Sequence, residues 1–223
     1  MKTKLIFSAL TKYILGLLMV GFLLFLPAGT LDYWNGWLFI GLLFIPMLIL
    51  GTVLLIKSPE LLEKRLRDKE TESEQKQVIV GSLIMFIGGF VVSALDYRFG
   101  WSDLPIAVIV MAAVLLLVSY GLYAEVMREN VYLSRTVEIQ ENQKVVDTGL
   151  YGIVRHPMYF VTTLLFLSIP LVLGSLVGLI VFLIYPILMV KRIKNEEEVL
   201  EKGLAGYKEY KEKVKYRLIP FIW

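Results

Sequence analysis

The sequence predicts an all-α fold: a polytopic membrane helix bundle of about six membrane segments, in which the last two form a helical hairpin, followed by a cytosolic C-terminal helix. Of the 223 residues, 57% are hydrophobic, and the mean hydropathy is +0.69. A soluble domain of this size cannot bury so much apolar surface. Long stretches of the chain carry no charge, and the basic residues gather between alternate stretches.

Four uncharged stretches are each close to the roughly 20 apolar residues that a spanning helix needs. They are Tyr13–Leu31, Trp37–Ile56, Val78–Leu95 and Leu104–Ala124. A fifth stretch, Met158–Val190, would be roughly 50 Å long as one helix, against a hydrocarbon core of about 30 Å. It must therefore tilt steeply or turn back on itself, and Pro170, Gly174 and Gly178 offer breaks near its middle.

The basic residues favour the turn. If 158–190 is a hairpin, every Lys and Arg except Arg98 falls on one side of the membrane. A single tilted span would carry the basic tail from Lys191 onward to the opposite side. Because cytoplasmic segments are enriched in Lys and Arg, we expect a multi-pass protein with a hairpin and with both termini in the cytoplasm.

This topology divides the chain into two parts. Residues 1–124 supply four transmembrane helices, with an amphipathic cytosolic linker at 57–77 whose helix starts at Pro59 and rests its leucines on the lipid headgroups. Residues 125–223 supply the hairpin 158–190, a cytosolic tail and the cofactor-binding catalytic region. The absence of cysteine excludes disulfides and thiolate chemistry. Because the chain also has a single histidine, no metal site is expected.

Two cytosolic segments flank the hairpin and carry unusual residues. Pro157 suits the first turn of a helix, and the unpaired N–H groups after it can bind an anion such as a carboxylate. Arg155 and His156 lie at this helix start, where the alternative is an interfacial Arg-His pair that snorkels before a span. On the other side of the hairpin, Arg192 and Glu196 are four residues apart and share a helix face. Polar groups at the membrane surface, within reach of lipid-borne and water-borne reactants, form a candidate site.

Together these segments resemble the isoprenylcysteine carboxyl methyltransferase family and, more loosely, the phospholipid N-methyltransferases. The resemblance extends from about residue 135 to the end of the sequence. In chain order, the matching elements are Gly149-Leu150-Tyr151, Arg155-His156-Pro157-Met158-Tyr159, the hairpin, Arg192-Ile193 with Glu196-Glu197, Leu200, Gly206-Tyr207-Lys208-Glu209-Tyr210 and Arg217-Leu218-Ile219-Pro220. Some membrane sterol reductases carry a similar Arg-His-Pro-x-Tyr element, so the order of the elements is the specific signal. The tail departs from the Phe-Gly pattern that is common in the family and has Leu204-Ala205-Gly206 in its place.

The resemblance implies a cytosolic pocket for S-adenosylmethionine and a lateral opening for a lipid. The cofactor contacts that it implies are Gln143, Lys144, Val145, Val146, Tyr151, His156, Pro157, Met158, Tyr159 and Glu196. Gln140, Arg155 and Glu197 are further candidates. Arg192 is the implied catalytic residue and the contact to the substrate.

We therefore expect a methyltransferase that acts on a lipid-like acceptor, with the carboxylate of a prenylated cysteine as the expected methyl acceptor. An ionised carboxylate needs no general base, and Arg192 could orient it, so that positioning is the main requirement. The expected partners are the bilayer and this acceptor, with no nucleic acid. The alternatives are a phospholipid amine N-methyltransferase, in which 196–198 would accept the proton, an NADPH-dependent reductase of an isoprenoid or sterol double bond, and a non-catalytic membrane protein.

Overall fold

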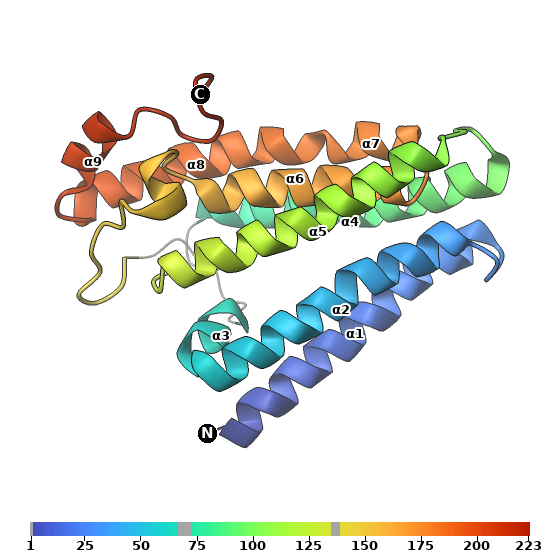
Figure 1. Ribbon diagram of the computed structural model, residues 1–223, viewed down its shortest axis with the longest axis horizontal. Helices are drawn as coiled ribbons and strands as arrows, with labels where there is room; N and C mark the ends of the chain where they lie inside the picture. The colour runs from blue at the N-terminus through green and yellow to red at the C-terminus, as the bar shows by residue number, and fades with distance from the viewer. Residues whose placement is uncertain (1, 67–72, 135–138) are drawn as a thin grey trace.

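The computed structural model describes residues 2–66, 73–134 and 139–223, and within these residues the chain is helical without β-strands (Figure 1). The predicted all-α fold is confirmed. The helices are α1 (Lys2–Ala28), α2 (Trp34–Lys57), α3 (Pro59–Leu66), α4 (Ser73–Phe99), α5 (Ile106–Glu129), the 3-10 helix η1 (Gly149–Gly152), α6 (Pro157–Val172), α7 (Leu176–Phe182), α8 (Ile184–Gly203) and α9 (Tyr207–Lys213).

Five helical segments of the described residues are long and apolar enough to cross a membrane. They are Lys4–Ala28, Trp34–Lys57, Lys76–Phe99, Ile106–Glu129 and Leu176–Gly203. The first four contain most of each predicted span, and the fifth joins α7 to α8. Helix α6 is apolar but has only 16 residues, so the count of six membrane segments stays a prediction.

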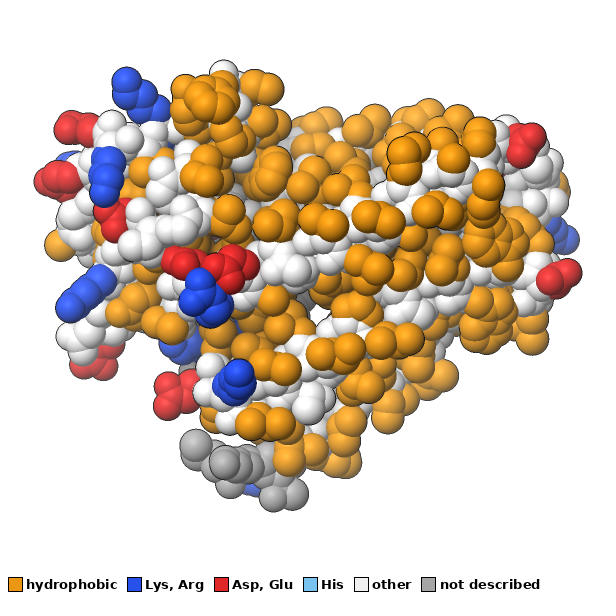
Figure 2. Space-filling model, in the orientation of Figure 1, with side chains coloured by type: hydrophobic (Ala, Val, Ile, Leu, Met, Phe, Trp, Pro, Cys, Tyr) orange, Lys and Arg blue, Asp and Glu red, His pale blue; other side chains and the backbone are white. Residues whose placement is uncertain are grey.

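Apolar side chains point outward along the length of the bundle. Figure 2 shows an almost continuous hydrophobic surface over its middle, with charged side chains gathered mainly at the end that carries α3 and α9. Phe22 of α1 and Met111 of α5 are each 63% exposed. Such a surface is stable only where lipid replaces water, which supports a multi-pass membrane protein. We call the end that carries α3, η1 and α9 the α9 end.

The long apolar stretch 158–190 is broken. Helix α6 ends at Val172, Gly174 adopts a left-handed φ of +79°, and the Ser175 hydroxyl accepts a hydrogen bond of 2.7 Å from the Gly178 N–H at the start of α7. Beyond this turn α8 lies beside α6 and runs the opposite way (Figure 1), and the Tyr185 hydroxyl donates to Oγ1 of Thr162 over 2.9 Å.

Buried polar groups stabilise this turn at the end opposite to α9. The carboxylate of Asp96, whose exposed fraction is 1%, accepts 2.7 Å hydrogen bonds from the Ser102 N–H and hydroxyl and a third from the hydroxyl of Ser175. Asn35 Nδ2 and the Tyr33 hydroxyl donate to the carbonyl oxygens of residues 172 and 173 over 2.8 and 2.7 Å. The end of α6 thus has protein partners for its carbonyl groups, as an apolar environment requires.

The helix at the start of the predicted linker 57–77 packs differently from the expectation. Helix α3 (Pro59–Leu66) starts at Pro59, as predicted, and residues 67–72 of the linker lie outside the described residues. Leu61 and Leu62 are buried in the protein, and Leu61 packs into the cluster that contains Tyr151. The expectation that these leucines rest on lipid headgroups is therefore wrong, because the protein itself supplies their apolar partners.

Candidate functional site

A cavity of about 750 Å³ opens at the α9 end of the bundle, within the size range of small-molecule sites. Its polar wall contains Tyr151, His156, Tyr159, Arg192 and Glu196. Its apolar wall comes from α2 and α4 through Leu43, Met47, Leu50, Ile79, Leu83 and Phe86. Polar groups from the second half of the chain thus share this cavity with apolar side chains from the first half.

Most of the predicted site residues line this cavity. They are Gln143, Lys144, Val145, Val146, Tyr151, Arg155, His156, Met158, Tyr159, Arg192 and Glu196. Pro157 and Glu197, which do not line it, lie directly beside residues that do. Pro157 occupies the first position of α6, as predicted, after His156 at the cap.

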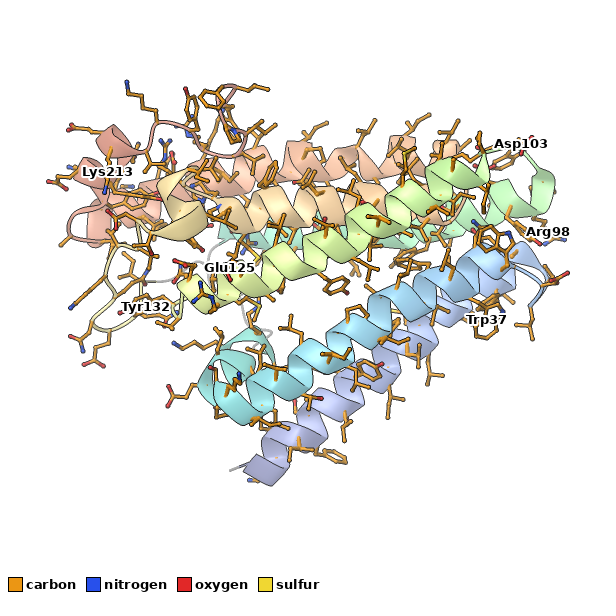
Figure 3. The ribbon with its side chains drawn as sticks, viewed as in Figure 1. Trp37, Arg98, Asp103, Glu125, Tyr132 and Lys213 are labelled. Atoms are coloured by element: carbon orange, nitrogen blue, oxygen red, sulfur yellow. The ribbon has the colours of Figure 1, made fainter. Side chains whose placement is uncertain are left out.

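Gln140 lies away from the cavity lining. Its Nε2 donates to the Tyr132 carbonyl oxygen over 2.5 Å, its Oε1 accepts from Lys64 Nζ over 2.6 Å, and its N–H donates to Gln143 Oε1 over 2.9 Å. Gln140 thus anchors the segment 143–146, which forms part of the cavity wall and has no regular secondary structure. Figure 3 shows Tyr132 at the same end of the molecule as Lys213 of α9, far from Trp37 and Asp103.

A buried ionic cluster holds the start of α6. Nε of Arg155 lies 2.7 Å from Oε1 of Glu197, and its Nη1 donates to the carbonyl oxygens of 214–215 over 2.7 and 2.8 Å. His156 Nε2 lies 3.3 Å from the same carboxylate, whose other oxygen accepts from Arg217 Nε over 2.8 Å. Buried charges are tolerated when they are paired and fully hydrogen-bonded in this way. The alternative of a snorkelling Arg-His pair is wrong, because both side chains are buried against Glu197.

The chain beyond α9 completes this arrangement. The N–H groups of Arg155 and His156 donate to the carbonyl oxygens of Tyr216 and Arg217 over 2.9 and 2.8 Å. The segment after α9 therefore runs beside the residues that precede α6 and fixes their backbone. Helix α8, the start of α6 and this final segment meet at one point.

Tyr159 connects the two motifs inside the cavity. Its hydroxyl donates to Oε2 of Glu196 and accepts from Nε of Arg192 over 2.8 Å. The Arg192 guanidinium lies 5.7 Å from the centre of the Tyr159 ring. The His156 ring stacks on the Tyr159 ring with a centroid distance of 5.8 Å. One tyrosine thus positions both a cation and a carboxylate on the cavity wall.

Several residues that line the cavity lie outside the set of predicted site residues. Arg65 of α3 donates to the Ser134 carbonyl oxygen over 3.3 Å and to the hydroxyl of Tyr123 of α5. Tyr207 of α9 also lines the cavity. Arg65 lies in a charged run typical of a solvated helix, and Tyr123 lies inside a predicted span, so neither carries a sequence signal of its own.

Two comparisons with known proteins bear on this site. Residues 104–205 match the sequence model of the family described as phospholipid methyltransferase. The match includes both motifs, and it confirms the resemblance to membrane methyltransferases. The Delta(14)-sterol reductase TM7SF2 of Mus musculus is 30% identical over 91 residues, which make up 40% of this chain and 22% of the reductase. The chain thus spans less than a quarter of that relative's length.

Proposed function

Because residues 104–205 match the sequence model of the phospholipid methyltransferase family, we propose that the protein transfers a methyl group from S-adenosylmethionine to a lipid-like acceptor in the 750 Å³ cavity. The observation that carries the proposal is the hydroxyl of Tyr159, which joins Arg192 and Glu196 on one wall of this cavity. A cofactor residue and a substrate residue expected from the resemblance therefore lie side by side.

The chemistry of the cavity fits this cofactor. The carboxylate of Glu196 suits an ammonium group or ribose hydroxyls, and Lys144 suits a carboxylate. Val145 and Leu200 supply apolar contacts for a nucleobase. When bound, the cofactor supplies a methyl group activated on a sulfonium. The protein's own contribution is to align the acceptor with that group and to exclude water.

Arg192 is the residue that we assign to the acceptor. A guanidinium can hold a carboxylate in a fixed orientation, and an ionised carboxylate is nucleophilic without a base. The apolar wall from α2 and α4 suits the hydrocarbon part of the same molecule. We therefore propose a prenylcysteine-type carboxylate as the acceptor. The distribution of basic residues supports a cytoplasmic location for the site and for both termini.

An alternative methyl acceptor is the amine of a phospholipid, which the description of the matching family supports. Methylation of an amine releases a proton, which the carboxylate of Glu196 on the cavity wall could accept. The similarity to a sterol reductase supports reduction of a double bond by NADPH as a second candidate function. Both alternatives use the same cavity and can be separated by the ligand that it binds.

Thermal unfolding of the detergent-purified protein with S-adenosylhomocysteine or with NADPH tests the cofactor. A ligand at about 100 times its dissociation constant stabilises the native state by roughly 2.7 kcal/mol. We expect stabilisation by S-adenosylhomocysteine, and its loss in Glu196→Gln. Stabilisation by NADPH alone would contradict methyl transfer and favour the reductase.

Transfer of a labelled methyl group tests the acceptor. Prenylcysteine and aminophospholipid acceptors are offered separately in vesicles, with the Arg192→Ala protein as the comparison. We expect the prenylcysteine to be methylated and the variant to lose most of this activity. A folded Arg192→Ala protein with full activity would remove Arg192 from the proposal, and methylation of the phospholipid alone would move the acceptor to the amine.

A further inference from the structure

Two tyrosines of helix α9 line the cavity and are buried to the same degree, but only one of their hydroxyls has a hydrogen-bond partner among the described residues. Tyr207 and Tyr210 are 4% and 5% exposed, and both line the cavity. The Tyr210 hydroxyl donates to the Tyr151 carbonyl oxygen over 2.7 Å. The Tyr207 hydroxyl has no hydrogen-bond partner among the residues that the structure describes. A buried hydroxyl without a partner is rare and costs stability.

Tyr207 cannot easily turn its hydroxyl to another group. Its ring packs against that of Tyr210, with a centroid distance of 5.8 Å, and belongs to a cluster with Leu204 and Val145. Gly206, with a φ of +84°, sets the turn by which α9 follows α8 and so fixes where the ring enters the cluster. The unpaired hydroxyl is therefore held in place within this cluster, on a side chain that lines the cavity.

The neighbouring charges indicate which ligand group this hydroxyl meets. Burial raises the pKa of Tyr207, and the carboxylates of Glu197 and Glu196 raise it further, so the side chain stays a neutral hydroxyl. The oxygens of Glu197 pair with Arg155 and Arg217, whereas Glu196 lines the cavity. A cationic group in the cavity would therefore be attracted to Glu196, whose charge also acts on Tyr207.

From this geometry we propose that the Tyr207 hydroxyl hydrogen-bonds the amino-acid end of the bound cofactor, whose ammonium group Glu196 neutralises. The inference rests on the proposed function, because it takes S-adenosylmethionine as the ligand. It adds a contact from α9, a segment that lies beyond the 104–205 match, and it assigns the amino-acid end of the ligand to that side of the cavity.

The test compares Tyr207→Phe with Tyr210→Phe, which is the matched control because it removes a paired hydroxyl from the same helix. Without ligand, Tyr207→Phe should melt at the same temperature as the parent protein or higher, and Tyr210→Phe should melt lower. Tyr207→Phe should bind S-adenosylhomocysteine about 3- to 10-fold more weakly, as expected for the loss of one hydrogen bond. Binding is measured by isothermal titration, so that no step depends on turnover.

A second ligand locates the contact. The nucleoside 5′-methylthioadenosine lacks the amino-acid end, so Tyr207→Phe and the parent protein should bind it equally. Unchanged affinity for S-adenosylhomocysteine, an equal loss for both ligands, or a lower melting temperature of ligand-free Tyr207→Phe would each overturn the assignment. If the parent protein binds neither ligand, the proposed function fails, and the assignment of Tyr207 fails with it.

Discussion

Oε1 of Glu197 lies 2.7 Å from Nε of Arg155, and both side chains are almost completely buried where α8 meets the start of α6. The preceding residue, Glu196, faces the cavity and accepts a hydrogen bond from Tyr159. Two successive glutamates therefore have different tasks. Glu197 stabilises the junction of three segments, and Glu196 belongs to the cavity wall.

Glu197→Gln should unfold far more easily than the parent protein. The substitution leaves Arg155 buried without its anion, and loss of one partner of a buried ion pair typically costs about 3–5 kcal/mol. Glu196→Gln should keep nearly the parent stability and lose affinity for S-adenosylhomocysteine. Denaturant unfolding in detergent and ligand titration measure the two effects. Equal stability of the two variants would remove the distinction between these glutamates.

Tyr159→Phe should reduce methyl transfer more than it reduces stability. The hydroxyl orients both Arg192 and Glu196, and small displacements of positioning groups lower rates by up to about 100-fold. The control is Tyr120→Phe, which removes a hydroxyl that donates to the Leu43 carbonyl oxygen over 2.9 Å on the apolar side of the cavity. Rates and melting temperatures are compared for both. A similar loss of rate in the control would show that any cavity tyrosine has this effect.

The membrane spans could be predicted from the sequence because the bilayer imposes a length and an apolar composition on each of them. The packing of α3 could not. Leu61 and Leu62 form an apolar face at helical spacing, and such a face looks the same whether lipid or protein covers it. Only the tertiary structure, which brings Tyr151 and its cluster from more distant parts of the chain against Leu61, decides that protein does so.

The site was predictable to the extent that its residues belong to the two motifs. His156, Tyr159, Arg192 and Glu196 line one cavity, although their roles stay predictions. The sequence could not separate Glu196 from Glu197, because a helix turns by about 100° per residue and only the tertiary packing decides which of the two faces the interior. The unpaired hydroxyl of Tyr207 likewise has no signature in the sequence.

Asp96→Ala should destabilise the protein without altering ligand affinity. Asp96 accepts hydrogen bonds from Ser102 and Ser175 at the end opposite to α9, where Figure 3 places Arg98 and Asp103. Each buried donor left unpaired costs about 1–3 kcal/mol. Asp96→Asn keeps one acceptor oxygen and should lose less stability. An altered dissociation constant for S-adenosylhomocysteine in folded Asp96→Ala would mean that this cluster communicates with the cavity.

Acid should weaken the ion pair between Lys213 of α9 and Asp147, which directly follows the cavity segment 143–146. Nζ of Lys213 lies 2.6 Å from Asp147 Oδ2 and lowers the pKa of Asp147 below its ordinary value of 3.8. A carboxyl group with a lowered folded-state pKa contributes stability above its unfolded-state pKa, and this contribution disappears as the pH falls through the folded-state value. Melting temperatures of the parent protein and Asp147→Asn should therefore differ at pH 6 and converge as the pH falls below 3.8 through the lowered folded-state pKa. A constant difference across this range would assign the effect to another cause.

Gly89→Ala should disrupt the packing of α4 against α7. A Cβ atom at this position would lie 2.4 Å from Cε2 of Phe182, whose side chain is fully buried. The helices must move apart or Phe182 must leave its rotamer, and overpacking of this kind costs about 1–3 kcal/mol. The matched control is Gly121→Ala in α5, where a Cβ atom would have no neighbour within 4 Å and the higher helix propensity of alanine should raise stability slightly.

Denaturant unfolding compares the two variants, and Phe182→Leu should restore stability in the Gly89→Ala background by making room. If Gly89→Ala matched the control, the contact between α4 and α7 would be looser than these distances indicate.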